Sequence, residues 1–168
     1  MPIQRLNHAV LYVRDVARSV AFYTEALGFR VVMEMPSQAA FLQAAGSTND
    51  HDLGLFAIGD RAGASTAGRS TVGLYHLAWE VDTLAELQRI REVLTERGAL
   101  VGASDHGSTK ALYAQDPDGI EFEVSWLVPA ALLDPEQSIS TRPLHLEREI
   151  ERYGADTRGG VGVSVPTA

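Results

Sequence analysis

Apolar and polar positions follow the same order of spacings twice along the chain. "LNHAVLYVRDVARSVAFYTEALGF", which begins at Leu6, opens with a short strand-like run and continues with apolar residues three and four positions apart. "LYHLAWEVDTLAELQRIREVLTERGA", which begins at Leu74, repeats that order at an offset of 68 residues. Because a spacing of three to four residues is that of an amphipathic helix, each copy predicts a strand followed by a helix. A repeat at a fixed offset predicts two similar modules.

Residues with helix-end chemistry lie at the boundaries of both predicted helices. Asp15 precedes the first helix, and Thr83 with Glu86 three residues later forms a capping box at the start of the second. Gly28 and Gly98 follow the last apolar turns, where a left-handed residue commonly ends a helix. These residues support both helices independently of the apolar spacing.

Three further apolar runs follow each helix and are bounded by turn residues. Their ranges are 29–35, 39–44 and 53–58 in the first copy, and 100–103, 111–115 and 120–127 in the second. The predicted fold class is therefore α+β, with two βαβββ modules at about residues 5–58 and 74–128 joined by a Gly- and Ser-rich linker at 59–73. We expect residues 1–133 to form a single domain, and residues 134–168 to form a C-terminal helical extension with a frayed tail.

A histidine is the third residue of the first predicted strand in each copy: His8 and His76. In the last predicted strand of the second copy, Glu121 and Glu123 share one face because strand side chains alternate. A lone strand histidine is more often a core or surface residue than a ligand, and a solvated face explains many acidic alternations. Two imidazoles and one carboxylate, however, form the set that holds Fe(II) with three positions open. The pattern alone leaves both interpretations open.

Composition narrows the possible functions. The net charge of −8 at pH 7 argues against non-specific binding to nucleic acid and to an anionic membrane surface. No apolar run approaches the ~20 residues of a membrane span, and "MPIQRLNHAV" lacks the basic-then-apolar order of a signal peptide, so we expect a cytoplasmic protein. Cysteine is absent, so a metal site must use His, Asp or Glu side chains.

The paired modules, the set His8, His76 and Glu123, and the stretch "YAQDPDGIEFE" resemble the vicinal oxygen chelate superfamily over roughly residues 5–128. That superfamily includes glyoxalase I, fosfomycin-resistance transferases, bleomycin-binding proteins and extradiol ring-cleaving dioxygenases. The resemblance implies curved sheets around a metal-centred pocket with these three residues as ligands. It also implies a homodimer or a higher homo-oligomer.

Within the superfamily, the extradiol dioxygenases are the most similar. Their signature is a histidine, a short spacer, an aliphatic–Tyr pair, a turn with proline and glycine, and the ligand glutamate. The chain has His106, the pair ending at Tyr113, the turn "DPDG" and Glu123, and His51 matches a further functional histidine of that family. Ser104, two residues before His106, departs from the signature, which prefers a different small or β-branched residue at this position.

The resemblance implies an enzyme that binds a catechol-type substrate and O2 at Fe(II), or at Mn(II), and yields a ring-opened semialdehyde. His51 would be its acid–base residue, because an imidazole titrates near neutral pH. Tyr113 would form a hydrogen bond with a substrate oxygen. His106 would be an orienting residue that closes the pocket. No nucleic acid or membrane partner is expected.

Two other functions remain open. A metal-dependent isomerase or transferase would use the same three ligands around Mn(II), Ni(II) or Zn(II). Glyoxalase I needs a fourth ligand, a glutamate, near a position where this chain has Leu53, Leu55 and Phe56. A metal-free protein that binds a planar aromatic ligand would leave the three ligand residues without a role.

The remaining polar residues of interest are assigned to structure: Asp116 and Asp118 to the turn, Glu121 to the end of a strand, and His145 to the surface. In the tail, "RPLHLEREIERYG" predicts an amphipathic helix over about Pro143 to Tyr153. We expect this helix to dock near the pocket or on a partner subunit.

Overall fold

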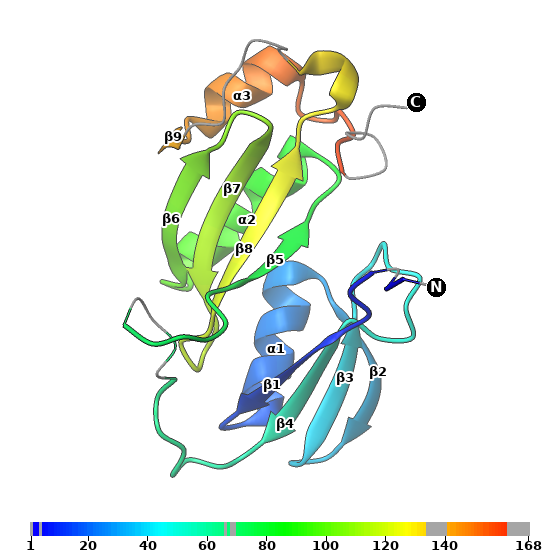
Figure 1. Ribbon diagram of the computed structural model, residues 1–168, viewed down its shortest axis with the longest axis vertical. Coiled ribbons are helices and arrows are strands. Elements are labelled where there is room, and N and C mark those ends of the chain that lie inside the picture. Colours follow the sequence, from blue (N-terminus) through cyan, green and yellow to red (C-terminus); the bar gives the residue numbers. More distant parts are fainter. Residues whose placement is uncertain (1, 4, 66, 68–69, 134–140, 161–168) are drawn as a thin grey trace. The chain divides into compact units, whose positions relative to one another are not determined.

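The computed structural model describes residues 2–3, 5–65, 67, 70–133 and 141–160, and it confirms the α+β class (Figure 1). The chain divides into two compact units. Unit 1 consists of Met1–Ser65 together with Asp116–Gly119, and unit 2 of Thr66–Gln115 together with Ile120–Ala168.

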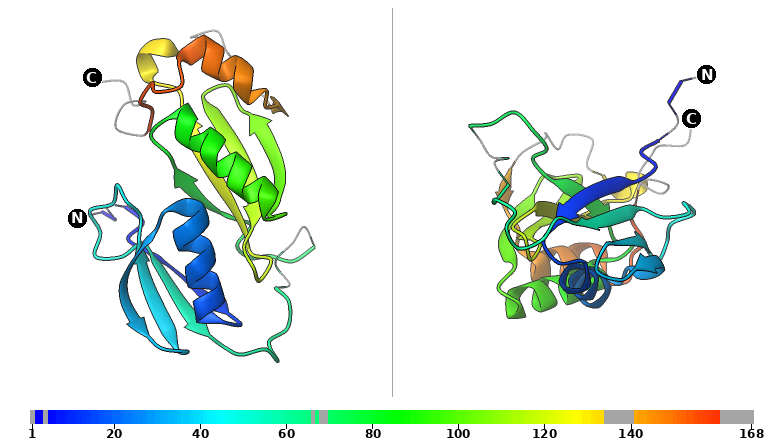
Figure 2. Two further views of the ribbon diagram at one scale, coloured as in Figure 1. Left: turned by 180° about the vertical axis from the view of Figure 1, so that it is seen from behind. Right: turned by 90° about the horizontal axis from the view of Figure 1, so that it is seen from below.

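Unit 1 is a four-stranded mixed sheet with one helix. Its elements are β1 (Ala9–Val13), α1 (Val16–Leu27), β2 (Arg30–Met35), β3 (Ala39–Gln43) and β4 (Leu53–Ala57). The strands lie in the order β1-β4-β3-β2, with β1 parallel to β4 and the other pairs antiparallel. Helix α1 lies across one face of this sheet (Figure 2) and buries Val16, Phe22, Tyr23 and Ala26 against it. The predicted helical spacing is thus the spacing of the buried face.

Both ends of α1 are formed as the sequence indicates. The Asp15 carboxylate accepts a hydrogen bond of 2.9 Å from the Arg18 N–H, and so caps the first turn. Gly28 has a φ of 72°, in the left-handed region where a residue without Cβ is favoured.

Unit 2 repeats this topology and adds a C-terminal extension. Its elements are β5 (Leu77–Glu80), α2 (Leu84–Glu96), β6 (Leu100–Asp105), β7 (Thr109–Gln115), β8 (Glu121–Leu127), the short 3₁₀ helix η1 (Ala130–Leu132), β9 (Arg142–Pro143) and α3 (Leu146–Tyr153). The sheet order is β5-β8-β7-β6-β9, so its first four strands match the order found in unit 1. This shared order confirms the repeat that the two similar segments predict.

The two repeat histidines do not lie inside strands, and that detail of the prediction is wrong. Strand β1 begins at Ala9 and β5 at Leu77, one residue after His8 and His76 respectively. The N–H of Ala9 makes the first hydrogen bond of the unit 1 ladder, 2.9 Å to the Asp52 carbonyl. Each histidine is therefore the residue that immediately precedes its strand, where the side chain is less constrained by cross-strand neighbours.

The turn between β7 and β8 packs with unit 1 rather than with the strands that flank it. The Asp118 carboxylate accepts hydrogen bonds from the backbone and the guanidinium of Arg14, at 2.9 and 2.8 Å, and from Arg18 at 2.6 Å. Burial opposes ionisation of this carboxyl, but the hydrogen bonds and charges of the two arginines outweigh it and hold the pKa of Asp118 below its usual value. The structural role expected for Asp118 therefore includes contacts far along the sequence.

The C-terminal extension is held to unit 2 by a buried cation. Lys110 of β7 is the only lysine in the chain, and its side chain is completely buried. Its Nζ lies 2.6 Å from Asp105 Oδ1 on β6 and 2.9 Å from Glu149 Oε2 on α3. The predicted tail helix is present but begins at Leu146 rather than Pro143, and it packs against α2 with Leu146 fully buried.

Among the described residues, no helix combines the length and the apolar character needed to cross a membrane.

Candidate functional site

His76 and Glu123 meet on one side of the unit 2 sheet. The parallel pairing of β5 with β8 sets Ala78 opposite Glu123, so the histidine just before β5 reaches the same face. The distance from His76 Nε2 to Glu123 Oε2 is 3.3 Å, and the side chains are 23% and 13% exposed. Both groups are therefore close to solvent, yet held in contact by the strands that carry them.

This pair has the geometry of two ligands to one metal ion. Two donor atoms with bonds of about 2.1 Å to a shared ion lie about 3.0–3.4 Å apart at octahedral to tetrahedral angles, which includes the observed separation. The other ring nitrogen, His76 Nδ1, is buried and has no hydrogen-bond partner in the part of the chain that the structure describes. The residues present thus fit a metal, although nowhere in the described ranges do three or more His, Asp or Glu side chains gather at one point.

Tyr113 and His106 lie beside this pair. Tyr113 of β7 is directly opposite Glu123 of β8, and its ring centroid is 5.8 Å from that of His76. The Tyr113 hydroxyl is 2.8 Å from His106 Nε2. Partial burial, followed by the negative charge of Glu123, raises the pKa of Tyr113, so the phenol keeps its proton at neutral pH. Unit 2 therefore brings four of the six predicted site residues together.

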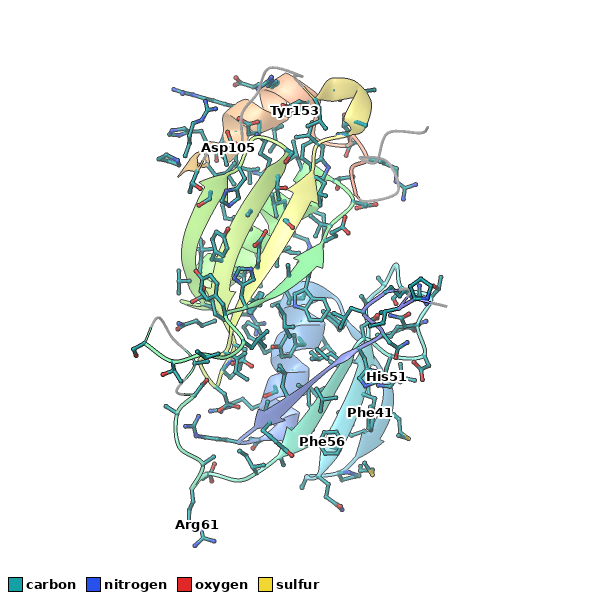
Figure 3. The ribbon with its side chains drawn as sticks, in the orientation of Figure 1. Phe41, His51, Phe56, Arg61, Asp105 and Tyr153 are labelled. Carbon is teal, nitrogen blue, oxygen red and sulfur yellow. The ribbon has the colours of Figure 1, made fainter. Side chains whose placement is uncertain are left out.

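The other two predicted residues, His8 and His51, pair within unit 1. Their ring centroids are 4.4 Å apart, and the His51 ring meets the edge of Phe41 at 5.1 Å. Phe56 packs edge-on against Phe41 in turn, at 5.8 Å, and Figure 3 shows these two rings and His51 gathered on one sheet. His51 Nδ1 is 3.3 Å from the Asp50 carboxylate. This group offers an aromatic surface with an imidazole at its rim.

The register of the two sheets shows which unit 1 residue corresponds to Glu123. In unit 2, the residue two positions after the histidine is Ala78, and it pairs with Glu123. In unit 1, the residue two positions after His8 is Val10, and it pairs with Gly54. The position equivalent to the ligand glutamate is therefore a glycine, not one of the neighbouring apolar residues that the sequence suggests. A fourth carboxylate ligand cannot come from it.

The sequence does not single out Thr141, which the structure places against His106, with Oγ1 3.3 Å from Nδ1. No motif marks this threonine, because its position depends on β9 pairing with β6. His145, which the sequence assigns to the surface, is exposed just before α3.

Comparison with known proteins agrees with this architecture. A catechol-2,3-dioxygenase of Bacillus subtilis is 32% identical over 120 residues, which make up 71% of this chain and 40% of the relative. A lactoylglutathione lyase of Salmonella typhimurium is also 32% identical, over 127 residues that make up 71% of this chain and 90% of the relative. The chain thus spans well under half the length of the dioxygenase but most of the length of the lyase.

A solved structure and a family model identify the fold. The structure of a glyoxylase/bleomycin resistance protein/dioxygenase domain from a Frankia species superposes with a TM-score of 0.61 at 23% identity, covering 74% of this chain and 92% of that one. The family model described as the Glyoxalase/Bleomycin resistance protein/Dioxygenase superfamily matches residues 5–124. The match spans both βαβββ modules, so the resemblance read from the repeat is confirmed. The chain belongs to the glyoxalase/bleomycin resistance/dioxygenase superfamily.

Proposed function

We propose that the protein is a metal-dependent extradiol dioxygenase, which cleaves a catechol-type ring beside its two hydroxyl groups and places both atoms of O2 in the product. The observation that carries this proposal is the hydrogen bond between Tyr113 and His106 beside the pair of His76 and Glu123. A phenol held next to two potential ligands suits a substrate that presents hydroxyl oxygens to a metal. The similarity to a catechol-2,3-dioxygenase supports the same reaction.

The proposed ligands are His8, His76 and Glu123, holding Fe(II) or, alternatively, Mn(II). Such an ion, when bound, supplies the redox chemistry that O2 requires and leaves positions open for the substrate. The carboxylate of Glu123 contributes the only negative charge of the set, so a divalent ion and a deprotonated hydroxyl would leave the centre near neutrality. His76 is already oriented by its contact with this carboxylate.

The remaining site residues would handle protons and position the substrate. The Tyr113 hydroxyl is held by His106 on one side and is able to donate its proton to a catechol oxygen on the other. His51 would act as the acid–base group, because its ring is only 18% exposed and its Nδ1 faces the Asp50 carboxylate, which orients it. Phe41 at the edge of His51 gives an apolar wall for an aromatic substrate.

The second candidate is a glyoxalase-type isomerase, which the similarity to lactoylglutathione lyase over 90% of that relative's length favours. Glyoxalase I uses a glutamate from each module, and here the counterpart of Glu123 is Gly54. A Cβ added at Gly54 would already lie 3.4 Å from a methyl of Val10, which leaves little room for a longer side chain. We therefore rank the dioxygenase first.

Oxygen consumption distinguishes the two functions. The protein is loaded with Fe(II) without air and given catechol or an alkyl- or aryl-substituted catechol, and O2 uptake is followed with an electrode. The expected result is one O2 consumed per catechol, with two labelled atoms in the ring-opened product when ¹⁸O2 is used. Protein loaded with Ni(II) or Zn(II) is tested in parallel for formation of lactoylglutathione. Turnover in that second assay, with no O2 uptake in the first, would reject the proposal in favour of the isomerase.

A variant pair connects the assay to the site. Tyr113→Phe removes a hydrogen bond to a charged oxygen, so we expect kcat/KM for the catechol to fall by about 10- to 100-fold with metal content unchanged. Tyr153→Phe is the matched control, because Tyr153, the last residue of α3, packs against Trp126 of β8 and its hydroxyl has no proposed role. Equal losses in both variants would count against a specific role for Tyr113.

A further inference from the structure

The turn between β6 and β7 presents His106 toward Tyr113. The backbone N–H of His106 donates a hydrogen bond of 2.9 Å to the Thr109 carbonyl. Gly107 has a φ of 84°, which residues with a side chain rarely adopt. The Asp105 carboxylate accepts a hydrogen bond of 2.8 Å from the Gly107 N–H. These contacts fix the backbone of the turn. The orientation of the His106 ring is set instead by the hydrogen bonds of its two ring nitrogens.

One of these nitrogens contacts the C-terminal extension. Strand β9 pairs antiparallel with β6, which sets Arg142 opposite Asp105 and Pro143 opposite Ser104. Thr141 therefore lies beside His106, and its Oγ1 is 3.3 Å from His106 Nδ1. Because the other nitrogen contacts Tyr113, the imidazole bridges the extension and the proposed site.

The extension is anchored on the opposite side of the same turn. Lys110 is three residues before Tyr113 on β7, so the two side chains point to opposite faces of the strand. The Lys110 ammonium joins Asp105, next to His106, to Glu149 of α3. The Lys110 Nζ also lies 5.7 Å from the ring centroid of Tyr153, the last residue of α3, and Figure 3 labels both Tyr153 and Asp105. The extension thus contacts the turn at two points: Thr141 contacts His106, and Glu149 is joined to Asp105 through Lys110.

The direction of the hydrogen bonds follows from what Tyr113 has to do. A phenol that donates its single proton to a substrate must accept a hydrogen bond from His106, so Nε2 must carry a proton. In a neutral imidazole Nδ1 is then an acceptor, and it needs a donor. The Thr141 hydroxyl, 3.3 Å from Nδ1, is placed to be that donor. With this tautomer, the chain of donors would run from Thr141 to His106 to Tyr113 to the substrate, and each bond would polarise the next.

We propose that Thr141 is a positioning residue, which holds His106 as the tautomer protonated at Nε2 and so leaves the Tyr113 hydroxyl free to donate to a substrate oxygen. The kinetic part of this inference rests on the proposed dioxygenase function, while the tautomer can be measured without any reaction. By this proposal, the C-terminal extension contributes a positioning residue to the site.

The test compares Thr141→Val, which removes the hydroxyl at nearly constant shape, with Thr141→Ser, which keeps it. Thr95→Val is the matched control, because the Thr95 hydroxyl donates a hydrogen bond of 2.7 Å to the Arg91 carbonyl of its own helix, away from His106 in sequence and fold. Two-bond ¹H–¹⁵N correlation spectra of the full chain, with Zn(II) in place of paramagnetic ions, report which nitrogen of His106 is protonated. The steady-state kinetics of Fe(II)-loaded protein with catechol are measured on the same variants.

We expect the parent, Thr141→Ser and Thr95→Val proteins to show His106 protonated at Nε2, and Thr141→Val to show a mixture of the two tautomers. Loss of one neutral hydrogen bond corresponds to about a 2- to 10-fold fall in kcat, with metal content and KM for catechol unchanged. A parent protein with His106 protonated at Nδ1, or a Thr141→Val variant with an unaltered tautomer, would overturn the inference. If no catechol is turned over, the proposed function fails, and the spectra still decide the role of Thr141.

Discussion

Lys110 offers the sharpest test of what holds the C-terminal extension to unit 2. Lys110→Met keeps a long side chain but removes the ammonium from between Asp105 and Glu149, whose side chains are only 15% and 13% exposed. Removing one partner of a buried ion pair typically costs about 3–5 kcal/mol, because the remaining charge is left uncompensated. Asp105 keeps its bond from the Gly107 N–H, and both carboxylates reach some water, so we expect a loss of about 3 kcal/mol.

The size of this loss should depend on pH in a defined direction. Burial raises the pKa of Asp105, but hydrogen bonds from Lys110 and from the Gly107 N–H outweigh it and hold that pKa below its usual value. A carboxyl with a lowered folded-state pKa contributes stability above its unfolded value of about 3.9, and this contribution is lost as the pH falls through the folded value. The difference between parent and Lys110→Met proteins should therefore be full at pH 7 and shrink as the pH falls below the unfolded value of about 3.9.

Urea unfolding at several pH values measures this difference. Calorimetry at pH 7 should show that the Tm of Lys110→Met is about 6–12 °C below that of the parent protein. Arg91→Met is the control, because Arg91 of α2 pairs with Glu147 of α3, whose side chain is 66% exposed, and an ion pair open to solvent on one side contributes less than about 1 kcal/mol. The double variant Lys110→Met/Glu149→Gln should recover part of the loss, since it removes one of the two stranded charges. A cost below 1 kcal/mol at pH 7, or no recovery in the double variant, would refute the account.

The remaining predictions concern the proposed ligands, the acid–base residue and the turn. His8→Ala, His76→Ala and Glu123→Ala should each lose bound metal while circular dichroism stays unchanged; full metal occupancy in a folded variant by elemental analysis would remove that residue from the ligand set. His51→Phe should keep its iron and bind catechol without O2, but turn over about 10²- to 10⁴-fold more slowly, and joint loss of metal and activity would instead identify a ligand. Asp118→Ala should lower the free energy of unfolding by about 2–3 kcal/mol in urea, because charged hydrogen bonds are lost, and a neutral result would contradict the anchoring of the turn.

The elements that the sequence predicts correctly are those whose cause is local. Helix α1 begins at the residue after Asp15 and ends just before Gly28, because a side-chain cap and a left-handed glycine act within one turn. The strands around "DPDG" follow in the same way from turn chemistry and alternation. The repeat then extends these local signals to a topology, since two copies of one pattern form the same strand order.

The features that the sequence leaves out depend on residues brought together over long distances. Asp118 meets Arg14 across 104 positions, and Thr141 meets His106 across 35. The register that sets Gly54 at the position of the ligand glutamate also needs the paired sheet, because a shift of one residue would select a neighbour. Lys110 looks like an ordinary strand residue until α3 supplies its second carboxylate.

The burial of Lys110 gives the protein a built-in chemical reporter. It is the only side-chain amine in the sequence, and its Nζ is enclosed between two carboxylates. An acylating reagent that modifies exposed amines can reach this nitrogen only when α3 and the β6–β7 turn separate, so the rate of mass gain at Lys110 follows the frequency of that opening. With no other lysine to compete for the reagent, a single peptide mass records how often the extension leaves the sheet.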